Sequence, residues 1–482
     1  MQGAHASEAT SGESFPQAVV GGLRAHSSHV NRLYSSEVEN EDGLLVPAPT
    51  SPAECVEAAP WSVASRPRCP RGAAPDSLQP ASDTHFRERS HTMNPPTAPL
   101  TGLKVVELGQ LIAGPFAAKT LADFGAEVIK VEPPGSGDPL RQWRLLHDGT
   151  SVWWQVQSRG KQSVVLDLRS EADRAVARAL IDDADVLIEN FKPGTLEAWG
   201  MGYETLCATN PGLVMLRISG FGQTGPYRDR PGFGVVAEAM GGLRHLTAEP
   251  GRVPVRVGVS IGDTLAALHG VIGILLALHH RSRSVSEDAP KGRGQVVDVA
   301  LYEAVFNCME SLLPEYSAFG VVREPAGSAL PGIAPSNAYA CRDGHVLVAG
   351  NGDSIFRRLM TAIGRDDLGA DPQLAGNAGR VARVAEIDAA IGAWTAKRDV
   401  AEVLDALNAA QVPAGRIYTA KDIAEDPHYR ARAMIERITT RDGLALDVPG
   451  VVPKLSATPG RIGSLAPALG EHTESVKKAL RR

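Results

Sequence analysis

The sequence has few cysteines, and none of them form a pattern that would hold a metal or a disulfide framework. The five cysteines are scattered over 482 residues, no two form a C-x-x-C pair, and their number is odd. This usage argues against a zinc site and for a reducing compartment. We therefore expect a cytoplasmic protein without a metal site.

Long apolar runs and an excess of one charge are also missing. No stretch reaches the roughly 20 consecutive apolar residues of a membrane span, and the best candidate, 265–278, contains His269 and two glycines. The formal net charge of −6 gives no support for nucleic-acid binding. We expect no membrane and no nucleic-acid partner, and a small anionic ligand would need a locally basic pocket.

Several catalytic signatures are absent as well. The first strand-to-helix turn, 107–115, lacks G-x-G-x-x-G, and the chain has no H-E-x-x-H, no G-x-S-x-G and no Walker loop. Dinucleotide-binding, metalloprotease, serine hydrolase and P-loop functions therefore have no support. We expect no tightly bound cofactor.

What is present is an ordinary globular composition, 43% hydrophobic and 22% charged, on a chain long enough for two domains. From residue 103 onward, short apolar segments alternate with helical patterns. This alternation predicts an α/β protein with a mostly parallel sheet covered by helices on both faces. The expected strands are 103–108, 127–131, 163–168, 185–188, 213–218 and 295–299, and the expected helices are 115–124, 170–182 capped by Ser170, 264–280, and 302–319 with a kink at Pro314.

The two flanking regions differ from this pattern. Residues 1–92 are rich in Ser, Ala, Pro, Glu and Gly without sustained periodicity, which is typical of disorder, and we expect Met93 to be the native start. Beyond a Gly/Pro-rich linker at 327–335, residues 336–426 resemble a smaller α/β unit. It is expected to contain a strand at 345–349 and helices near 354–363, 385–396 and 401–410.

Asp263 is the leading candidate for chemistry. It follows Gly262 directly before an apolar helix, where the helix dipole holds a carboxylate ionised and little bulk surrounds it. Such a group suits a nucleophile that attacks an acyl group and becomes acylated itself. Aspartate is also a favoured N-cap, so a purely structural role stays open. His269, inside the same helix, is interpreted as a hydrogen-bonded core histidine.

Loops after the predicted strands supply candidate ligand contacts. The first turn, including Ile112 and Ala113, lies where doubly wound folds bind ligands. Asn190, Phe191 and Lys192 follow a later strand and could contact phosphate or pantetheine, although taken alone Lys192 is better explained as a solvated charge. Glycine-rich stretches at 220–225, 232–234 and 350–352 indicate either close approach to a ligand or simple turns.

Taken in order, these stretches resemble the family III CoA-transferases, the group that contains formyl-CoA transferase and carnitine CoA-transferase. The resemblance runs from about residue 98 to the C-terminus. It rests on 100–108, Ala113-Gly114-Pro115, 121–132, Gly135-Ser136-Gly137-Asp138, Glu189-Asn190-Phe191-Lys192-Pro193-Gly194, Gly222-Gln223-Thr224-Gly225-Pro226, Gly292-Arg293-Gly294-Gln295 and Leu469-Gly470-Glu471-His472-Thr473.

The resemblance implies an interlocked homodimer. Each chain would have a Rossmann-like large CoA-binding domain (93–325, completed by 431–482) and a smaller inserted α/β domain (326–430). It makes Asp263 the nucleophile, with acyl-CoA as substrate rather than as a bound cofactor. The residues expected to bind CoA or substrate are Ile112, Ala113, Leu166, Arg169, Asn190, Phe191, Lys192, Phe233, Gly350 and Gly352, the last two in a loop that resembles the family's glycine lid.

The implied reaction moves CoA from an acyl-CoA to a free carboxylic acid through an aspartyl anhydride and an aspartyl-CoA thioester. Ile112 and Phe233-Gly234 depart from the formyl-CoA transferase pattern, which favours a succinyl-type or branched dicarboxylate instead of formate and oxalate. Two alternatives stay open. An α-methylacyl-CoA racemase would need a histidine where Phe233 stands, and a silent acyl-CoA-binding protein would have no use for Asp263.

Overall fold

The computed structural model describes residues 37–39, 45–47 and 98–481, within two compact units, Met1–Arg89 and Ser90–Arg482. In the first unit, β1 (Glu37–Glu39) and β2 (Leu45–Pro47) pair antiparallel, which the sequence did not predict. The rest of the segment expected to be disordered, 1–92, lies outside the described residues. Everything below concerns the second unit.

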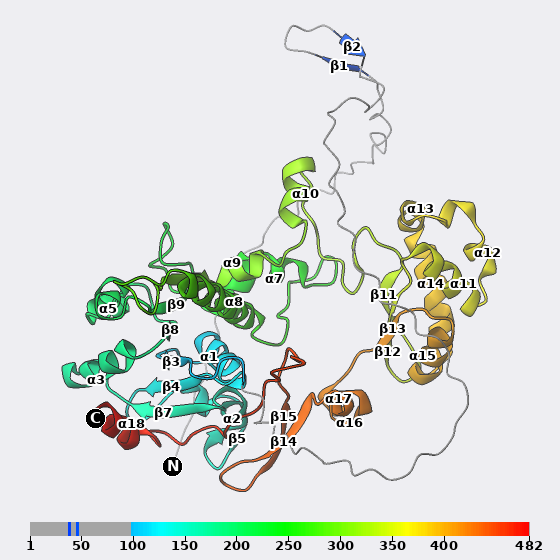
Figure 1. The fold of residues 1–482 in the computed structure, drawn as a ribbon. Coiled ribbons are helices and arrows are strands. Elements are labelled where there is room, and N and C mark those ends of the chain that lie inside the picture. Colours follow the sequence, from blue (N-terminus) through cyan, green and yellow to red (C-terminus); the bar gives the residue numbers. More distant parts are fainter. Residues whose placement is uncertain (1–36, 40–44, 48–97, 482) are drawn as a thin grey trace, which may run out of the picture. The chain divides into compact units, whose positions relative to one another are not determined.

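A six-stranded parallel sheet forms the centre of this unit (Figure 1), which confirms the predicted α/β class. Its order is β10-β9-β8-β3-β4-β7, so the chain proceeds outward from β3 to one edge and then returns to build the other half from β8. Ligands of doubly wound sheets bind at the carboxyl ends of the strands where the order reverses, here between β3 and β8. The strands are β3 (Lys104–Glu107), β4 (Glu127–Glu132), β7 (Lys161–Val165), β8 (Val186–Glu189), β9 (Val214–Ser219) and β10 (Val296–Ala300).

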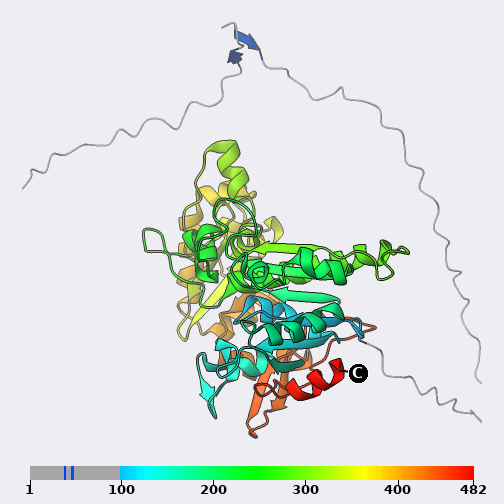
Figure 2. The same cartoon turned by 90° about the vertical axis from the view of Figure 1, so that its left-hand side faces the viewer.

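Helices cover both faces of the sheet, as the alternation of elements predicts. Because successive strand residues point to opposite faces, Val105 belongs to one apolar core and Val106 to the other. The first core contains α1 (Ala113–Asp123) and α8 (Ile261–Arg283). The second contains α3 (Glu171–Asp182), α5 (Tyr203–Thr209) and the last helix, α18 (Thr473–Leu480), drawn in red in Figure 2.

Helix α8 is longer than the expected 264–280. Within the described residues it is the one helix with the length and hydropathy of a membrane span, with a mean hydropathy of 1.9 over its most apolar window. It packs on β9, β10 and α1, and 33% of that window is buried in the chain. Leu268, Ile272 and Leu276, spaced one turn apart, are exposed on its outer side, so the single chain leaves an apolar stripe uncovered.

Three local predictions need correction. The segment 302–319 forms two helices, α9 (Leu301–Phe306) and α10 (Leu312–Phe319), with Pro314 in the first turn of α10, where its missing N–H is not needed. Strand β7 ends at Val165, which leaves Leu166 and its neighbours in a loop. Ser170 precedes α3, but its side chain makes no capping hydrogen bond.

A third core surrounds a small antiparallel sheet, drawn in yellow and orange in Figure 1. Its strands are β11 (Ser336–Ala340), β12 (His345–Ala349) and β13 (Ala414–Arg416), and its main helices are α11 (Asp353–Ala362), α14 (Val384–Thr395) and α15 (Val400–Ala409). The predicted strand and helices of this region are thus present. The proposed boundaries at 326 and 430 stay predictions.

The C-terminal segment returns to the large sheet. The backbone N–H of His472 donates to Ser163 O at 2.9 Å, and Val165 N donates to Thr473 Oγ1 at 3.0 Å.

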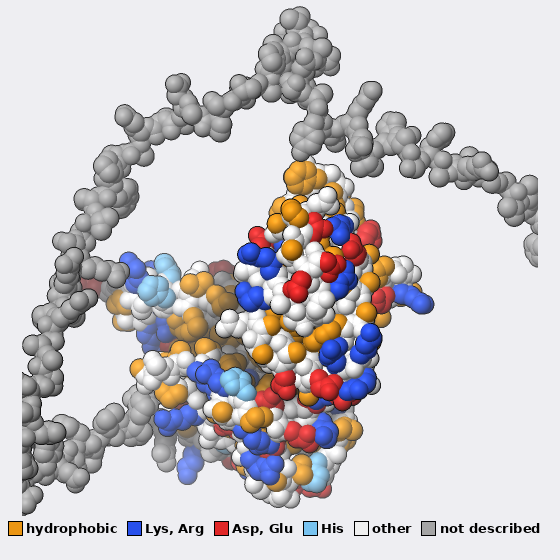
Figure 3. Space-filling view, turned by 90° about the vertical axis from the view of Figure 1, so that its right-hand side faces the viewer, with side chains coloured by type: hydrophobic (Ala, Val, Ile, Leu, Met, Phe, Trp, Pro, Cys, Tyr) orange, Lys and Arg blue, Asp and Glu red, His pale blue; other side chains and the backbone are white. Residues whose placement is uncertain are grey.

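On the face drawn in Figure 3, basic and acidic side chains are intermixed. The remaining elements are β5 (Leu146–His147), β6 (Thr150–Ser151), β14 (Ile435–Thr439), β15 (Ala445–Pro449), α2 (Val152–Gln157), α4 (Thr195–Ala198), α6 (Gly234–Met240), α7 (Leu243–Leu246), α12 (Asp366–Gly369), α13 (Asn377–Ala382), α16 (Ala420–Glu425), α17 (Pro427–Ala431), and 3-10 turns at Pro139–Gln142 and Pro372–Leu374.

Candidate active site

A cavity of about 370 Å³ opens at the carboxyl edge of the sheet, across the reversal point between β3 and β8. This volume lies within the range of ordinary small-molecule sites, roughly 300–1,000 Å³. It is lined by residues that follow four neighbouring strands, together with the start of α8: 110–113, 190–193, 218–220, 228, 230–233, Asp263 and Leu301. Six of the ten predicted CoA- or substrate-binding residues, and the predicted nucleophile, are among them.

The turn after β3 is held rigidly in this cavity. The Asn190 side chain accepts from Gln110 N at 2.8 Å and donates to Gln110 O at 2.9 Å, which ties the β3 and β8 loops together. Leu111 has φ +64°, an unusual backbone conformation for a branched residue. Its N–H donates to the Asp138 carboxylate at 3.1 Å. Ile112 and Ala113, which follow, are buried in the cavity wall.

Asp138 belongs to a buried charge network that the sequence did not reveal. Lys130 Nζ lies 2.8 Å from Asp138 Oδ2 and 2.7 Å from Glu107 Oε1, and it donates to Gly109 O at 2.8 Å. Lys161 Nζ lies 2.7 Å from Glu107 Oε2. The ion-pair partners are 8 to 54 residues apart in the chain and lie on different strands and loops, so no local spacing could indicate them.

The residues after β8 divide into structural and ligand-facing groups. Both the oxygen and the nitrogen of the Asn190 amide are hydrogen-bonded to the Gln110 backbone, so Asn190 connects the β3 and β8 loops. Phe191 meets Trp199 edge to face, with ring centroids 5.5 Å apart, and lines the cavity beside Lys192, which is exposed. No acidic side chain in residues 98–481 pairs with Lys192, so its ammonium group can contact a ligand in the cavity.

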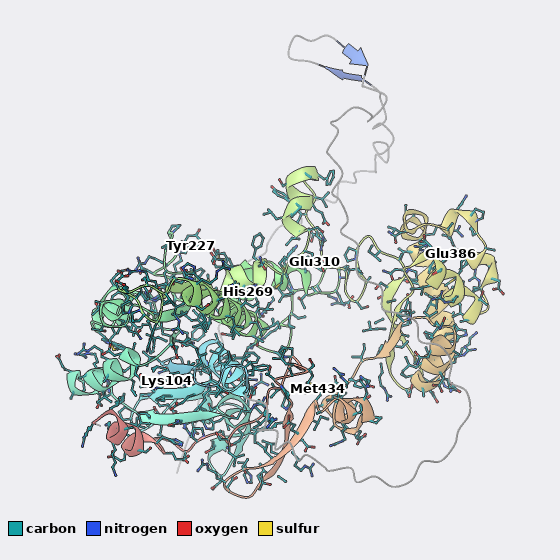
Figure 4. The ribbon with its side chains drawn as sticks, in the orientation of Figure 1. Lys104, Tyr227, His269, Glu310, Glu386 and Met434 are labelled. Atoms are coloured by element: carbon teal, nitrogen blue, oxygen red, sulfur yellow. The ribbon has the colours of Figure 1, made fainter. Side chains whose placement is uncertain are left out.

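The glycine-rich loop after β9 brings Phe233 and α6 to the nucleophile. Gly220 and Gly232 approach so closely that a Cβ on Gly220 would lie 2.8 Å from the Gly232 Cα, so both must be glycine. Arg228 and Arg230 also line the cavity, and the Arg230 guanidinium stacks 3.6 Å from the centroid of the Tyr227 ring. Figure 4 labels Tyr227 in this loop and His269 on α8.

Asp263 lies in the first turn of α8 and is not its N-cap, since Ser260 holds that position. Its carboxylate rests against the backbone of α6, where a Cβ on Gly234 would lie 2.1 Å from Asp263 Oδ2. Burial and, to a smaller extent, the negative charge of Glu238 raise the pKa of Asp263 to about 6, against the opposing effects of a backbone hydrogen bond and of Arg256. The sequence interpretation of a carboxylate held ionised by the helix is therefore incomplete, because burial and Glu238 oppose the dipole.

The other predicted binding residues lie elsewhere. Leu166 and Arg169 line an adjacent cavity of about 170 Å³ that shares Gln110 and Phe191 with the first. Arg169 is exposed and pairs with Asp167 at 2.9 Å. Gly350 and Gly352 follow β12 of the small antiparallel sheet and are not among the residues that line either cavity. Their role as a lid therefore stays a prediction.

The remaining titratable candidates are accounted for without metal chemistry. Between residues 98 and 481 no group of three or more His, Cys, Asp or Glu side chains could hold a metal ion. In the same range Cys207, Cys308 and Cys341 are free thiols. His269 lies 2.9 Å from Leu265 O and 3.3 Å from Asn307 Oδ1, so it is hydrogen-bonded as predicted, but it is half-buried and not a core residue.

The comparisons with known proteins decide the family. The family model described as CoA-transferase family III matches residues 100–473. The chain belongs to CoA-transferase family III. The enzyme is similar to a succinyl-CoA–D-citramalate CoA-transferase from Chloroflexus aurantiacus, at 49% identity over 79% of this chain and 94% of the relative.

Two further comparisons agree. The beta subunit of a succinyl-CoA–L-malate CoA-transferase from Chloroflexus aurantiacus is 42% identical over 80% of this chain and 94% of the relative. A solved CAIB/BAIF family protein from Brucella suis is 37% identical with a TM-score of 0.69, over 80% of this chain and 100% of that one. These similarities identify the enzyme as a CoA-transferase and give no support to the silent binding protein.

Proposed function

We propose that the enzyme moves CoA from a succinyl-CoA-like donor to a free dicarboxylic acid, with Asp263 as the covalent nucleophile. The observation that carries this proposal is the position of Asp263, a partly buried carboxylate that lines a cavity at the strand-order reversal point and has glycine backbone against it. A nucleophile needs this open approach, and the raised pKa makes the ionised form more basic than an ordinary aspartate.

The proposed reaction begins with attack of an Asp263 carboxylate oxygen on the donor thioester carbonyl. A C–O bond forms, the C–S bond breaks, and the products are a mixed anhydride and CoA thiolate. The thiolate then attacks the aspartyl carbonyl, which releases the donor acid and leaves an aspartyl-CoA thioester. The acceptor carboxylate attacks that thioester and expels the thiolate. Attack of the thiolate on the acceptor's carbonyl yields the new acyl-CoA and restores Asp263.

The charge of the cavity supports a dicarboxylate substrate. Lys192, Arg228 and Arg230 line it together with one carboxylate, Asp263. It is the locally basic pocket that an anionic ligand needs in a protein of net charge −6. The succinyl group, citramalate and malate, which the relatives' names specify, each carry a second carboxylate. We infer that one of these cations contacts that distal carboxylate.

We also propose the interlocked homodimer with a Rossmann-like large domain. Two exposed apolar surfaces support a second copy of the chain as partner: the α8 stripe described above, and Leu313, Tyr316 and Phe319 on α10. Large exposed apolar surfaces on soluble proteins mark interaction sites. Since Gly350 and Gly352 line neither cavity, the lid over Asp263 would be supplied by the second copy.

The test is a panel of dicarboxylic and monocarboxylic acids incubated with succinyl-CoA, with the CoA esters separated by chromatography. We expect new CoA esters from one or a few dicarboxylic acids, none from Asp263→Ala, and a dimer for both proteins by light scattering. Full turnover by Asp263→Ala would contradict the proposal. Deuterium uptake at the substrate α-carbon without CoA exchange would instead indicate a racemase.

A further inference from the structure

A second carboxylate lies behind the nucleophile and is unusually isolated. Glu238 is fully buried, and its Oε1 has no hydrogen-bond partner among the described residues. Its other oxygen, Oε2, accepts from Arg244 Nη2 at 3.2 Å, the only ion pair that Glu238 makes in residues 98–481. A buried carboxylate with one free oxygen is costly to keep, which suggests that its charge serves the site.

The fold places Glu238 close to Asp263. Gly234 and Glu238 are four residues apart on α6 and therefore share one face of that helix. Gly234 rests against the Asp263 carboxylate, and a Cβ on Gly262 would lie 3.6 Å from Glu238 Cγ. Glu238 does not line the cavity, so it acts on the substrate only through Asp263.

The charged groups around this pair come from several elements. The charges that act on Asp263 are Glu238 on α6 and Arg256 in the preceding loop, and Asp263 shares its cavity with the three cations described above. Glu238 faces Asp263 and Arg244. Helix α9, which packs on both α6 and α8, contributes Glu303, which is exposed and accepts from Tyr302.

We propose that Glu238 is a positioning residue whose buried negative charge, balanced in part by Arg244, sets the nucleophilicity of Asp263. This inference rests on the proposed function, in which Asp263 attacks the thioester. In the resting enzyme the two carboxylates repel each other. When Asp263 becomes an anhydride or a thioester it loses its charge and the repulsion ends, so the interaction raises the energy of the ground state and not that of the acylated enzyme.

The test is the pH dependence of kcat/KM for Glu238→Gln, which removes the charge and keeps the shape. Because the ionised form of Asp263 attacks, kcat/KM rises with pH through the pKa of Asp263. Removing a nearby like charge lowers that pKa, so we expect the acidic limb to move to lower pH by about one unit. Substrate ionisation is the same for both proteins, so the difference between them reports on the enzyme.

Two variants separate charge from packing. Glu238→Asp keeps the charge, so the acidic limb of its kcat/KM profile should lie at the wild-type pH even if kcat falls. Glu303→Gln removes an exposed carboxylate from the neighbouring helix and should leave the profile unchanged, since solvent screens it. If Glu238→Gln does not fold, the double variant Glu238→Gln/Arg244→Gln replaces it, because it leaves neither member of the ion pair buried without its partner. It should show the same shift of the acidic limb to lower pH.

The inference would be overturned if the acidic limb of the kcat/KM profile stayed in place or moved to higher pH in Glu238→Gln. It would also be overturned if Glu238→Asp, which keeps the charge, shifted the limb as Glu238→Gln does. Glu238 would then serve only to pack α6 against its neighbours. These results presuppose an active wild-type enzyme. A wild-type protein without CoA-transfer activity would refute the proposed function itself, and so the two failures are distinguishable.

Discussion

Two sets of buried charges lie at the same edge of the sheet, and they are partnered very differently. Under the β3 turn, Lys130 contacts Glu107, Asp138 and a backbone carbonyl, all within 2.8 Å. Beside α8, Asp263 and Glu238 face each other as like charges, and one oxygen of Glu238 has no hydrogen-bond partner among the residues that the structure describes. The first set holds the backbone of the site in place, and we propose that the second keeps the Asp263 carboxylate reactive.

The largest expected effect follows from removing the reactive carboxylate. Asp263→Asn keeps the shape of the side chain and abolishes covalent transfer, so we expect kcat to fall by about 10⁴-fold or more. Chromatography of CoA esters measures it. If Asp263→Asn kept more than a tenth of wild-type turnover, Asp263 would not be the nucleophile. The two sets of charges would then no longer differ as a structural and a catalytic set.

The paired set should respond in stability. Lys130→Met leaves Asp138 buried without its cation and Glu107 paired with Lys161 alone, which should lower the free energy of unfolding by about 3–5 kcal/mol. Lys192→Met removes an exposed lysine of the same cavity region and should change it by less than about 0.5 kcal/mol. Denaturant titration compares the two, and an equal loss for both would contradict the account of the network.

The close contact between α6 and α8 gives a third prediction. A methyl group at Gly234 would overlap the Asp263 carboxylate and displace it by about 1 Å, so Gly234→Ala should lower kcat about 10²-fold. Gly392→Ala is a matched helical control, because a Cβ there meets nothing within 4 Å. Steady-state kinetics of both variants decide whether the Gly234 contact or a general effect of replacing glycine is responsible.

The reactive carboxylate should also cost stability, with a defined pH dependence. The pKa of Asp263 is about 6 in the folded enzyme and about 4 in the unfolded chain. The folded state therefore binds the proton more tightly, and the wild type loses stability as the pH rises from about 4 to 6. Asp263→Asn should be more stable than the wild type by about 2–3 kcal/mol at pH 7 and nearly equal to it at pH 4. A difference that is constant with pH would contradict the raised pKa.

The smallest effect is expected at the exposed edge of the second cavity. Arg169→Gln should raise KM for the acyl-CoA by no more than about fivefold, if the arginine contacts CoA there, and should not change stability. Arg365 pairs with Asp367 in the small unit as Arg169 pairs with Asp167, two residues away and on the surface. Arg365→Gln is therefore the matched control and should leave KM unchanged.

The sequence predicted the sheet, which the structure confirms, and it singled out Asp263, which lines the cavity; both have local signals. The apolar segments of β3, β4, β8 and β9 are short, bounded by turns and separated by helices, and Gly262-Asp263 lies at the start of an apolar helix. The sequence did not predict that 302–319 divides into two helices, because the apolar periodicity continues across Pro314. Proline is also common in the first turn of a helix, and there it marks the start of a new helix and not a kink.

The surroundings of the site could not be predicted in the same way. Asp138 contacts Leu111 across 27 residues, and Asn190 contacts Gln110 across 80. Glu238 reaches Asp263 only because α6 folds back onto α8. These contacts depend on how loops and helices meet in three dimensions, for which no spacing in a single sequence is a signal.

The most direct test is peptide mapping of the enzyme after incubation with succinyl-CoA and rapid quenching. We expect a hydroxylamine-sensitive adduct on the peptide that contains Asp263, and no such adduct in Asp263→Asn. An adduct on another residue, or CoA exchange that proceeds with no covalently modified enzyme at all, would contradict the central role of this carboxylate.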